Sequence, residues 1–236
     1  MKSIKNWDNK TWLSSKNYIN SFNSFLIKNT KLNSNSRILD IGCGRGKILG
    51  NLYAKLKLKT KPIGLDIESH KDKDKNISFK KKDAIKFFIK DKYNYDLILI
   101  KQTIHLLKIN QIKKLVKLCK KHLSPKGKIF IFTLDYKNNE IPTFKLMKKK
   151  LNNSFNRDRK ILKMIEEDNK NIKKKKFIYT VQIPKKKYIQ MISNRYISTL
   201  LDFKTSEIKK GIQEIKLDFN EKIIFRDKLF CLILNQ

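Results

Sequence analysis

Seven residues near the start of the chain combine a carboxylate with a cluster of glycines: Asp40-Ile41-Gly42-Cys43-Gly44-Arg45-Gly46. The whole chain contains only seven glycines, and three of them fall at alternate positions within these few residues. Glycine lets the backbone turn tightly and lets a nucleotide-type ligand approach the main chain closely. A tight structural turn uses the same residue type, so this loop alone is compatible with either role.

Two further aspartates come after the loop, each behind a short apolar segment. Asp66 closes the segment 62–67, 20 residues after Gly46, and Asp83 comes after the segment 76–79. A carboxylate in the first position can accept hydrogen bonds from ribose hydroxyls. One in the second can reach an adenine amino group. Either aspartate alone is more often a solvated loop residue or a helix cap, but the two together, in this order, favour a nucleoside site.

The elements that must position these residues are predicted by the apolar pattern. Short apolar runs at 37–41, 62–67, 76–79, 95–100 and 128–134 predict five strands, with a turn predicted at 124–127. Helix-length segments separate them, among them 47–56 and 111–122. Strands separated in this way are typical of a parallel sheet with helices on both faces. The sequence therefore predicts an α/β fold.

The loop and its spacing resemble a known family. Asp-x-Gly-x-Gly-x-Gly at 40–46 is similar to the first motif of class I S-adenosylmethionine-dependent methyltransferases. It differs from the NAD fingerprint, whose third glycine comes one residue later. Asp66 and the segments 82–84, 95–99 and 123–127 resemble successive landmarks of the same family. The resemblance covers about residues 35–135.

The resemblance implies a Rossmann-like, mostly parallel seven-stranded sheet with an antiparallel last strand, and S-adenosylmethionine as cofactor. It further implies that Asp40 and the glycine loop hold the methionine moiety, that Asp66 holds the ribose and Asp83 the adenine, and that Gln102 lies beside the methyl donor. The complete set of expected cofactor-binding residues is Asp40, Gly42, Cys43, Gly44, Gly46, Asp66, Ile67, Asp83, Ala84 and Gln102.

A single domain is expected, divided into four parts. Residues 1–34 form an N-terminal lid with an amphipathic helix from about 14 to 29, and 35–134 form the cofactor-binding core. Residues 135–211 form an insertion that covers the substrate. Residues 212–236 contain the closing strands, with 223–234 predicted as two short strands around a tight turn. Trp7, Trp12 and Tyr18 either cap the ligands from the lid or simply pack against the sheet.

The residues directly after the fourth predicted strand bear on the substrate class. Lys101-Gln102-Thr103-Ile104-His105 lacks the Asn/Asp-Pro-Pro-aromatic motif of amino-methylating DNA and RNA enzymes. The chain therefore looks like the small-molecule branch, of the trans-aconitate or juvenile-hormone-acid type. Arg195 and Tyr196, in the insertion, resemble a substrate-facing segment that suits a carboxylate acceptor. His105 is a candidate general base, although a packing role is equally compatible with its position.

The net charge of +35 raises the question of whether the protein binds a nucleic acid. Only six of the 56 basic residues are arginine, whereas arginine supplies the bidentate contacts that specific readers favour. Drift in amino-acid composition is the favoured explanation of this charge. Non-specific binding of nucleic acid at low salt is then still expected. An RNA methyltransferase and a non-catalytic methyltransferase-like binding module remain the alternatives.

Several classes are disfavoured by what the sequence lacks. The three cysteines and three histidines have no disulfide or metal-ligand spacing, so no metal is expected. No stretch reaches the roughly 18 apolar residues of a membrane span, and residues 1–7 contain no apolar signal region. These features predict a soluble cytoplasmic protein.

Overall fold

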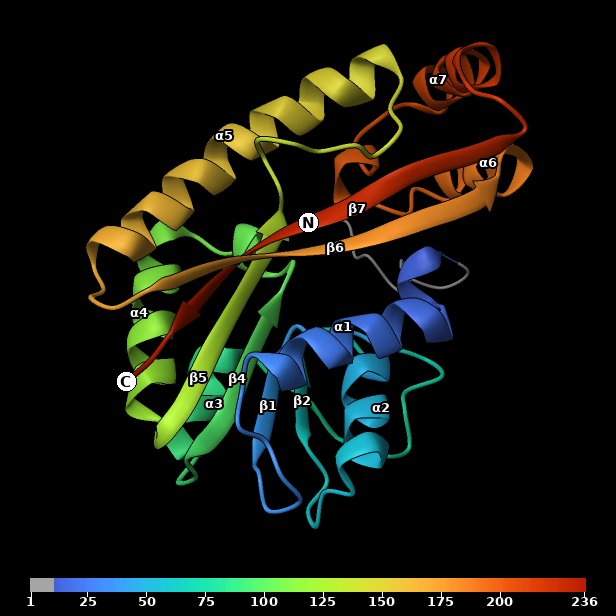
Figure 1. The fold of residues 1–236 in the computed structure, drawn as a ribbon. Helices are drawn as coiled ribbons and strands as arrows, with labels where there is room; N and C mark the ends of the chain where they lie inside the picture. The colour runs from blue at the N-terminus through green and yellow to red at the C-terminus, as the bar shows by residue number, and fades with distance from the viewer. Residues whose placement is uncertain (1–10) are drawn as a thin grey trace.

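The structure, a computed structural model, describes residues 11–236 and contains one seven-stranded sheet (Figure 1). The strands are β1 (Ile38–Ile41), β2 (Ile63–Asp66), β3 (Ser78–Lys81), β4 (Tyr95–Lys101), β5 (Leu123–Leu134), β6 (Lys173–Pro184) and β7 (Lys222–Leu234). The helices are α1 (Lys16–Lys28), α2 (Lys47–Leu56), α3 (Ala84–Lys90), α4 (Ile109–Lys121), α5 (Lys145–Glu167), α6 (Lys185–Ser193) and α7 (Thr205–Asp218). Three short 3-10 turns, η1 (Trp12–Ser14), η2 (Ile104–Leu106) and η3 (Ser198–Leu200), complete the described elements.

The strand order is β3-β2-β1-β4-β5-β7-β6. Strands β1 to β5 run parallel to one another, and β7 runs antiparallel to both β5 and β6. The predicted mostly parallel sheet with an antiparallel last strand is therefore confirmed. The chain reverses its direction of travel across the sheet between β1 and β4, which is where open α/β sheets bind ligands.

Helices cover both faces of the sheet because the central strands are apolar on both sides. In β4, Leu97 and Leu99 join the cluster beneath α1 and α2, whereas Ile98 and Ile100 join the cluster beneath α3, α4 and α5. Successive side chains of a strand point to opposite faces, so a continuous apolar run supplies both cores at once. Figure 1 shows α6 and α7 beyond the carboxyl ends of the parallel strands, beside the N-terminal half of β7.

The N-terminal helix α1 begins after Ser15, whose hydroxyl accepts the backbone N–H of Tyr18 and so caps the helix. One face of the helix buries Tyr18, Phe22 and Leu26 completely. The fully buried Asn23 fixes α1 on α2, because its amide donates to the carbonyl of Ile48 and to the side chain of Asn51. The predicted helix at 14–29 is thus present and packs tightly on the core.

The end of the chain differs from its prediction. Residues 222–234 form one continuous strand, β7, instead of two short strands around a turn. The polar residues Arg226, Asp227 and Lys228 are the reason that the sequence predicts a turn. They remain in the ladder with β6 because Arg226 and Lys228 pair with Glu140 and because Asp227 is buried, where the Trp12 indole hydrogen-bonds to it.

Two other boundaries also differ. The predicted turn at 124–127 is a bulged start of β5, because Gly127 has no Cβ and lets the carbonyl of Tyr95 approach its backbone. Within the expected insertion, residues 145–167 form one long helix, α5. Within the expected insertion 135–211, residues 173–184 form β6 at the edge of the main sheet.

Candidate cofactor site and acceptor side

The glycine loop comes directly after β1 and is fixed to the neighbouring strand β2. The backbone N–H groups of Gly42 and Cys43 both donate to the carbonyl of Leu65, at 2.8 and 2.9 Å. Gly42, Gly44 and Gly46 have φ values of +77°, +54° and +71°, in the left-handed region that favours glycine. The alternate glycines therefore produce the tight path from β1 into α2.

The three glycines differ in what surrounds them. A Cβ at Gly42 would collide with the side chain of Thr103, and one at Gly46 would collide with that of Ile77. At Gly44 no atom lies within 4 Å of the position that a Cβ would take. Packing thus explains two glycines, whereas the third leaves the backbone accessible on one side, as a bound ligand requires.

Asp40, at the end of β1, is the second sign of a ligand. Its side chain is buried, and Oδ1 has no hydrogen-bond partner within residues 11–236. Burial raises the pKa of Asp40 to about 7; the ammonium of Lys101 opposes this shift and the Asp66 carboxylate adds to it. A buried acceptor without a partner costs free energy unless a ligand satisfies it. This carboxylate fits a cationic or hydrogen-donating group.

Asp66 stands at the end of the adjacent strand β2 and orders the loop from the other side. Its Oδ2 accepts the N–H of Gly44 at 2.9 Å, and its Oδ1 accepts the N–H of Glu68 at 2.9 Å. His70 Nε2 lies 3.5 Å from the same carboxylate. The next side chain, Ile67, is 63% exposed although it is large and apolar. An exposed apolar side chain beside the carboxylate that is expected to bind ribose suits a nucleoside ligand.

The remaining predicted cofactor residues lie along the same edge of the sheet. Asp83 caps α3 by accepting the N–H of Lys86 at 3.0 Å through Oδ1, and Ala84 is the first residue of that helix. Gln102 comes after β4 with a φ of +51°, a backbone conformation that non-glycine residues rarely adopt. Because β3, β2, β1 and β4 are neighbours, the structure brings Asp83, Asp66, Asp40 and Gln102 into one row.

His105 lies in η2, shortly after β4. Burial, together with the positive charge of Arg157, lowers the pKa of His105 to about 4, so the imidazole is neutral at physiological pH. A neutral imidazole can accept a proton, but a conjugate acid with so low a pKa makes it a weak base.

Arg195 and Tyr196 come after α6 and are engaged within the protein. Arg195 takes a φ of +54° in the turn that ends α6, and its guanidinium donates to the carbonyl of Leu200 at 2.5 Å. The Tyr196 hydroxyl lies 2.9 Å from that of Tyr188, which donates to the carbonyl of Pro142. Both side chains therefore contribute to the packing of α6 and of the turn that follows it, which together we call the α6 segment.

Two charged residues that the sequence does not single out, Lys101 and Asp227, interact with residues of the sites described above. The Lys101 ammonium acts on both Asp40 and Asp227, opposing the rise in the pKa of each carboxyl. Asp227 is 1% exposed and accepts the indole N–H of Trp12 at 3.0 Å. In the sequence, the only sign of a buried carboxylate here is a charged residue within the apolar run 223–234. Such a residue is equally typical of a turn.

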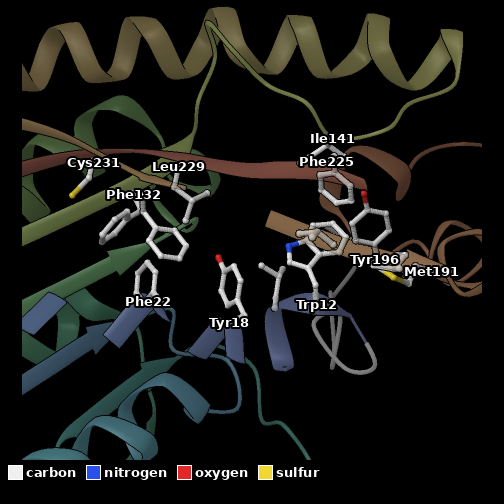
Figure 2. Packing of buried hydrophobic residues seen from close by; sticks show 14 of the residues in the cluster. Trp12, Tyr18, Phe22, Phe132, Ile141, Met191, Tyr196, Phe225, Leu229 and Cys231 are labelled. Atoms are coloured by element: carbon white, nitrogen blue, oxygen red, sulfur yellow. The ribbon is translucent and has the colours of Figure 1, made fainter. Parts of the chain in front are cut away.

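Of the predicted lid residues, Trp12 and Tyr18 face this same region, and Trp7 lies outside the described residues. The ring of Trp12 contacts those of Tyr196 and Phe225 edge-on, at centroid distances of 5.4 and 5.1 Å. Figure 2 shows Trp12 beside these two rings, with Tyr18 farther along the same layer toward Phe22 and Phe132. These lid residues thus contribute to packing and also border the polar group Asp227.

Other chemistries find less support among the described residues. Burial raises the pKa of the Cys43 thiol strongly, which opposes a nucleophilic role. Within residues 11–236 no three histidine, cysteine, aspartate or glutamate side chains are grouped as metal ligands would be. Nor does that part of the chain include a helix long and apolar enough to cross a membrane.

Solved structures share this fold. A protein assigned as a methyltransferase of an antibiotic biosynthesis pathway from Anabaena variabilis is 12% identical, with a TM-score of 0.62 over 91% of this chain and 96% of that one. The plantazolicin methyltransferase BpumL, solved with S-adenosylhomocysteine, is 21% identical with a TM-score of 0.53, over 98% of this chain and 88% of that one. An S-adenosylmethionine-dependent methyltransferase from Archaeoglobus fulgidus is 18% identical, with a TM-score of 0.50 over 92% and 94% of the two chains.

Comparison with curated proteins gave no match. The methyltransferase domain family matches residues 16–175, which is more than half of the chain. This match confirms the predicted enzyme class, and the shared fold agrees with the expected S-adenosylmethionine cofactor. The trans-aconitate or juvenile-hormone-acid type is not distinguished by these comparisons. On its sequence and its fold, the chain belongs to the family of methyltransferase domains.

Proposed function

We propose that the chain transfers a methyl group from S-adenosylmethionine to a small polar molecule, which binds between the glycine loop and the α6 segment. The observation that carries this proposal is the combination of Asp40, buried with an unpaired Oδ1, and the open backbone at Gly44. Both lie at the switch point of the sheet, where ligands of α/β folds bind.

The residues that would hold the cofactor are those along the edge of β3, β2, β1 and β4. Asp40 and the backbone around Gly44 would hold the methionine part, Asp66 with Ile67 the ribose, and Asp83 with Ala84 the adenine. When bound, S-adenosylmethionine supplies an activated methyl group on a positively charged sulfur. The contribution of the protein is then to hold the acceptor in line with that methyl group and to exclude water.

The acceptor is proposed at the level of a small polar molecule. BpumL has also been solved in complex with pentazolic and monoazolic desmethylPZN analogues and S-adenosylhomocysteine. The sequence favours an anionic acceptor on the strength of Arg195 and Tyr196. Because Arg195 donates to Leu200 and Tyr196 pairs with Tyr188, neither contact supports that expectation, and a carboxylate acceptor stays a prediction from sequence.

The test is to incubate the purified protein with methyl-labelled S-adenosylmethionine and a whole-cell extract, and then to separate small molecules from RNA and protein. Label in the small-molecule fraction is expected. Asp40→Asn should abolish the labelling and weaken the binding of S-adenosylhomocysteine, measured by titration calorimetry. Label recovered mainly in RNA would instead support the RNA methyltransferase. Binding of the cofactor without any transfer would support the non-catalytic module.

A further inference from the structure

Asp227 is an unusual residue for the middle of a strand. It lies in β7, is 1% exposed, and accepts a hydrogen bond from the Trp12 indole. Burying a carboxylate is costly, and the strand ladder that holds β7 in place needs no charge there. A buried carboxylate with a raised pKa is a candidate functional group.

The groups that face Asp227 come from four separate elements. They are Trp12 of η1, Tyr18 of α1, Lys101 of β4 and Tyr196 after α6. The Tyr18 hydroxyl is completely buried and lies beside Asp227, where it lowers the pKa of that carboxyl as a hydrogen-bond donor does. A buried hydroxyl thus points to this carboxylate and can donate either to it or to a bound acceptor.

Lys101 links the cofactor side, with Asp40, to the β7 side, with Asp227. Its ammonium is close enough to act on both Asp40 and Asp227, and it lies 5.5 Å from the ring centroids of Tyr18 and Phe22. It therefore stands between the cofactor side and the β7 side. Both buried carboxylates therefore lie within the electrostatic reach of the same ammonium, and a further negative charge beside an ionised Asp227 would be disfavoured.

We infer that Asp227 and the Tyr18 hydroxyl form the polar end of the acceptor subsite, and that they select an acceptor bearing a hydrogen on its nucleophile, an amine or a hydroxyl, over a carboxylate. An N–H or O–H group can donate to Asp227 while it accepts from Tyr18. A third carboxylate in this poorly solvated region would be repelled. This inference rests on the proposed methyl transfer and specifies its acceptor.

Such an acceptor must lose a proton when it is methylated, and Asp227 is placed to take it. Asp227 accepts the acceptor's N–H or O–H proton while the freed lone pair forms the bond to the methyl carbon. The electron pair of the broken carbon–sulfur bond remains on sulfur. Burial raises the pKa of Asp227, against the opposing effects of Trp12, Lys101 and Tyr18, and so makes the carboxylate a better proton acceptor.

The product itself distinguishes the two acceptor classes. The protein is incubated with methyl-labelled S-adenosylmethionine and an extract freed of protein and nucleic acid, and the products are then treated with dilute alkali. Methyl esters release volatile methanol, whereas N-methyl and O-methyl products keep the label. Label that stays non-volatile is expected. Volatile methanol as the main product would overturn the inference and leave the methyltransferase assignment intact.

Asp227→Asn tests the residue, since an amide keeps an acceptor for Trp12 but cannot take a proton. We expect labelling to fall by roughly 100-fold or more, with the affinity for S-adenosylhomocysteine unchanged in calorimetry. The matched control is Asp135→Asn, which removes another buried carboxylate that pairs with Lys176 at 2.8 Å. This control should keep its activity. Full activity in Asp227→Asn, or a loss of cofactor binding, would contradict the assignment.

A readout independent of turnover comes from Trp12, the only tryptophan in the described part of the chain. In a Trp7→Phe background, fluorescence should change as Asp227 titrates, because the indole N–H bonds to that carboxylate. Asp227→Asn should remove this change. A pH response identical in both proteins would show that Asp227 does not titrate beside Trp12. Failure of the parent protein to bind S-adenosylhomocysteine would instead refute the proposed function itself.

Discussion

At the scale of single residues, the candidate site consists of groups whose local requirements are unmet by the protein alone. Gly44 has a left-handed backbone and open space beside it, and Asp40 has a buried, unpaired oxygen. Neither improves packing. Residues that break the local rules of stability in this way are expected at functional sites.

Gly44→Ala and Gly42→Ala form a matched pair that separates strain from fit. Both place a Cβ at positive φ, which costs roughly 1–2 kcal/mol of unfolding free energy. Only at Gly42 does the new atom also collide with Thr103. We expect Gly44→Ala to remain folded but to lose affinity for S-adenosylhomocysteine, and Gly42→Ala to be far less stable. Calorimetry and thermal unfolding check both, and unchanged affinity in Gly44→Ala would remove that residue from the site.

Asp40 predicts a pH dependence with a definite sign. Its pKa of about 7 lies above the ordinary 3.8. The folded state therefore loses stability as the pH rises from 4 through 7. A positively charged cofactor prefers the ionised carboxylate, so affinity for S-adenosylmethionine should rise by about ten-fold between pH 6 and 8. Asp40→Asn should be more stable than the parent at pH 8 and equal to it at pH 4. A flat affinity profile would contradict this role.

At the scale of elements, the acceptor side is assembled from segments far apart in the chain. The hydrogen bond from Trp12 to Asp227 joins η1 to β7 across 215 positions. The α6 segment adds Tyr196, whose ring contacts that of Trp12. The N-terminal segment, β7 and the turn after α6 therefore meet in one place.

Arg195→Ala tests whether the turn after α6 is structural. The guanidinium holds the carbonyl of Leu200, so its loss should lower the unfolding free energy by about 1–2 kcal/mol. Affinity for S-adenosylhomocysteine should stay the same. Stability is measured by chemical denaturation. If the variant is as stable as the parent but its turnover has fallen, Arg195 contacts the substrate, as the sequence suggests.

At the scale of the whole molecule, the charge of +35 is the dominant property. Lysines occur throughout the sequence, from α2 and α4 to the run Lys173–Lys176 that begins β6 at the edge of the sheet. Lysine on an edge strand also opposes pairing with other chains. A dispersed positive charge of this kind attracts polyanions without selecting a sequence.

RNA binding by the purified protein should accordingly be electrostatic. Its affinity should fall by orders of magnitude between about 50 and 200 mM salt, since counterion release drives such binding. Different RNAs of equal length should compete equally in a filter-binding assay. Selective binding of one RNA at physiological salt would favour the RNA methyltransferase over a small-molecule enzyme.

The sequence by itself determined which residues gather at the proposed cofactor site. The glycine loop, Asp66 and Asp83 are local features, each placed after its own strand, and the sheet order β3-β2-β1-β4 brings them together as the resemblance implied. Short-range patterns suffice there, because a parallel α/β unit places the carboxyl end of every strand at the same edge.

Only the tertiary structure decided the acceptor half. Asp227 resembled a turn residue, and its burial depends on Trp12, Tyr18 and Lys101, which come from three other elements. Arg195 resembled a substrate contact, but the carbonyl of Leu200, brought close by a left-handed turn, binds its guanidinium. Strand periodicity records which face is apolar, whereas the partner of a buried charge is fixed by long-range packing.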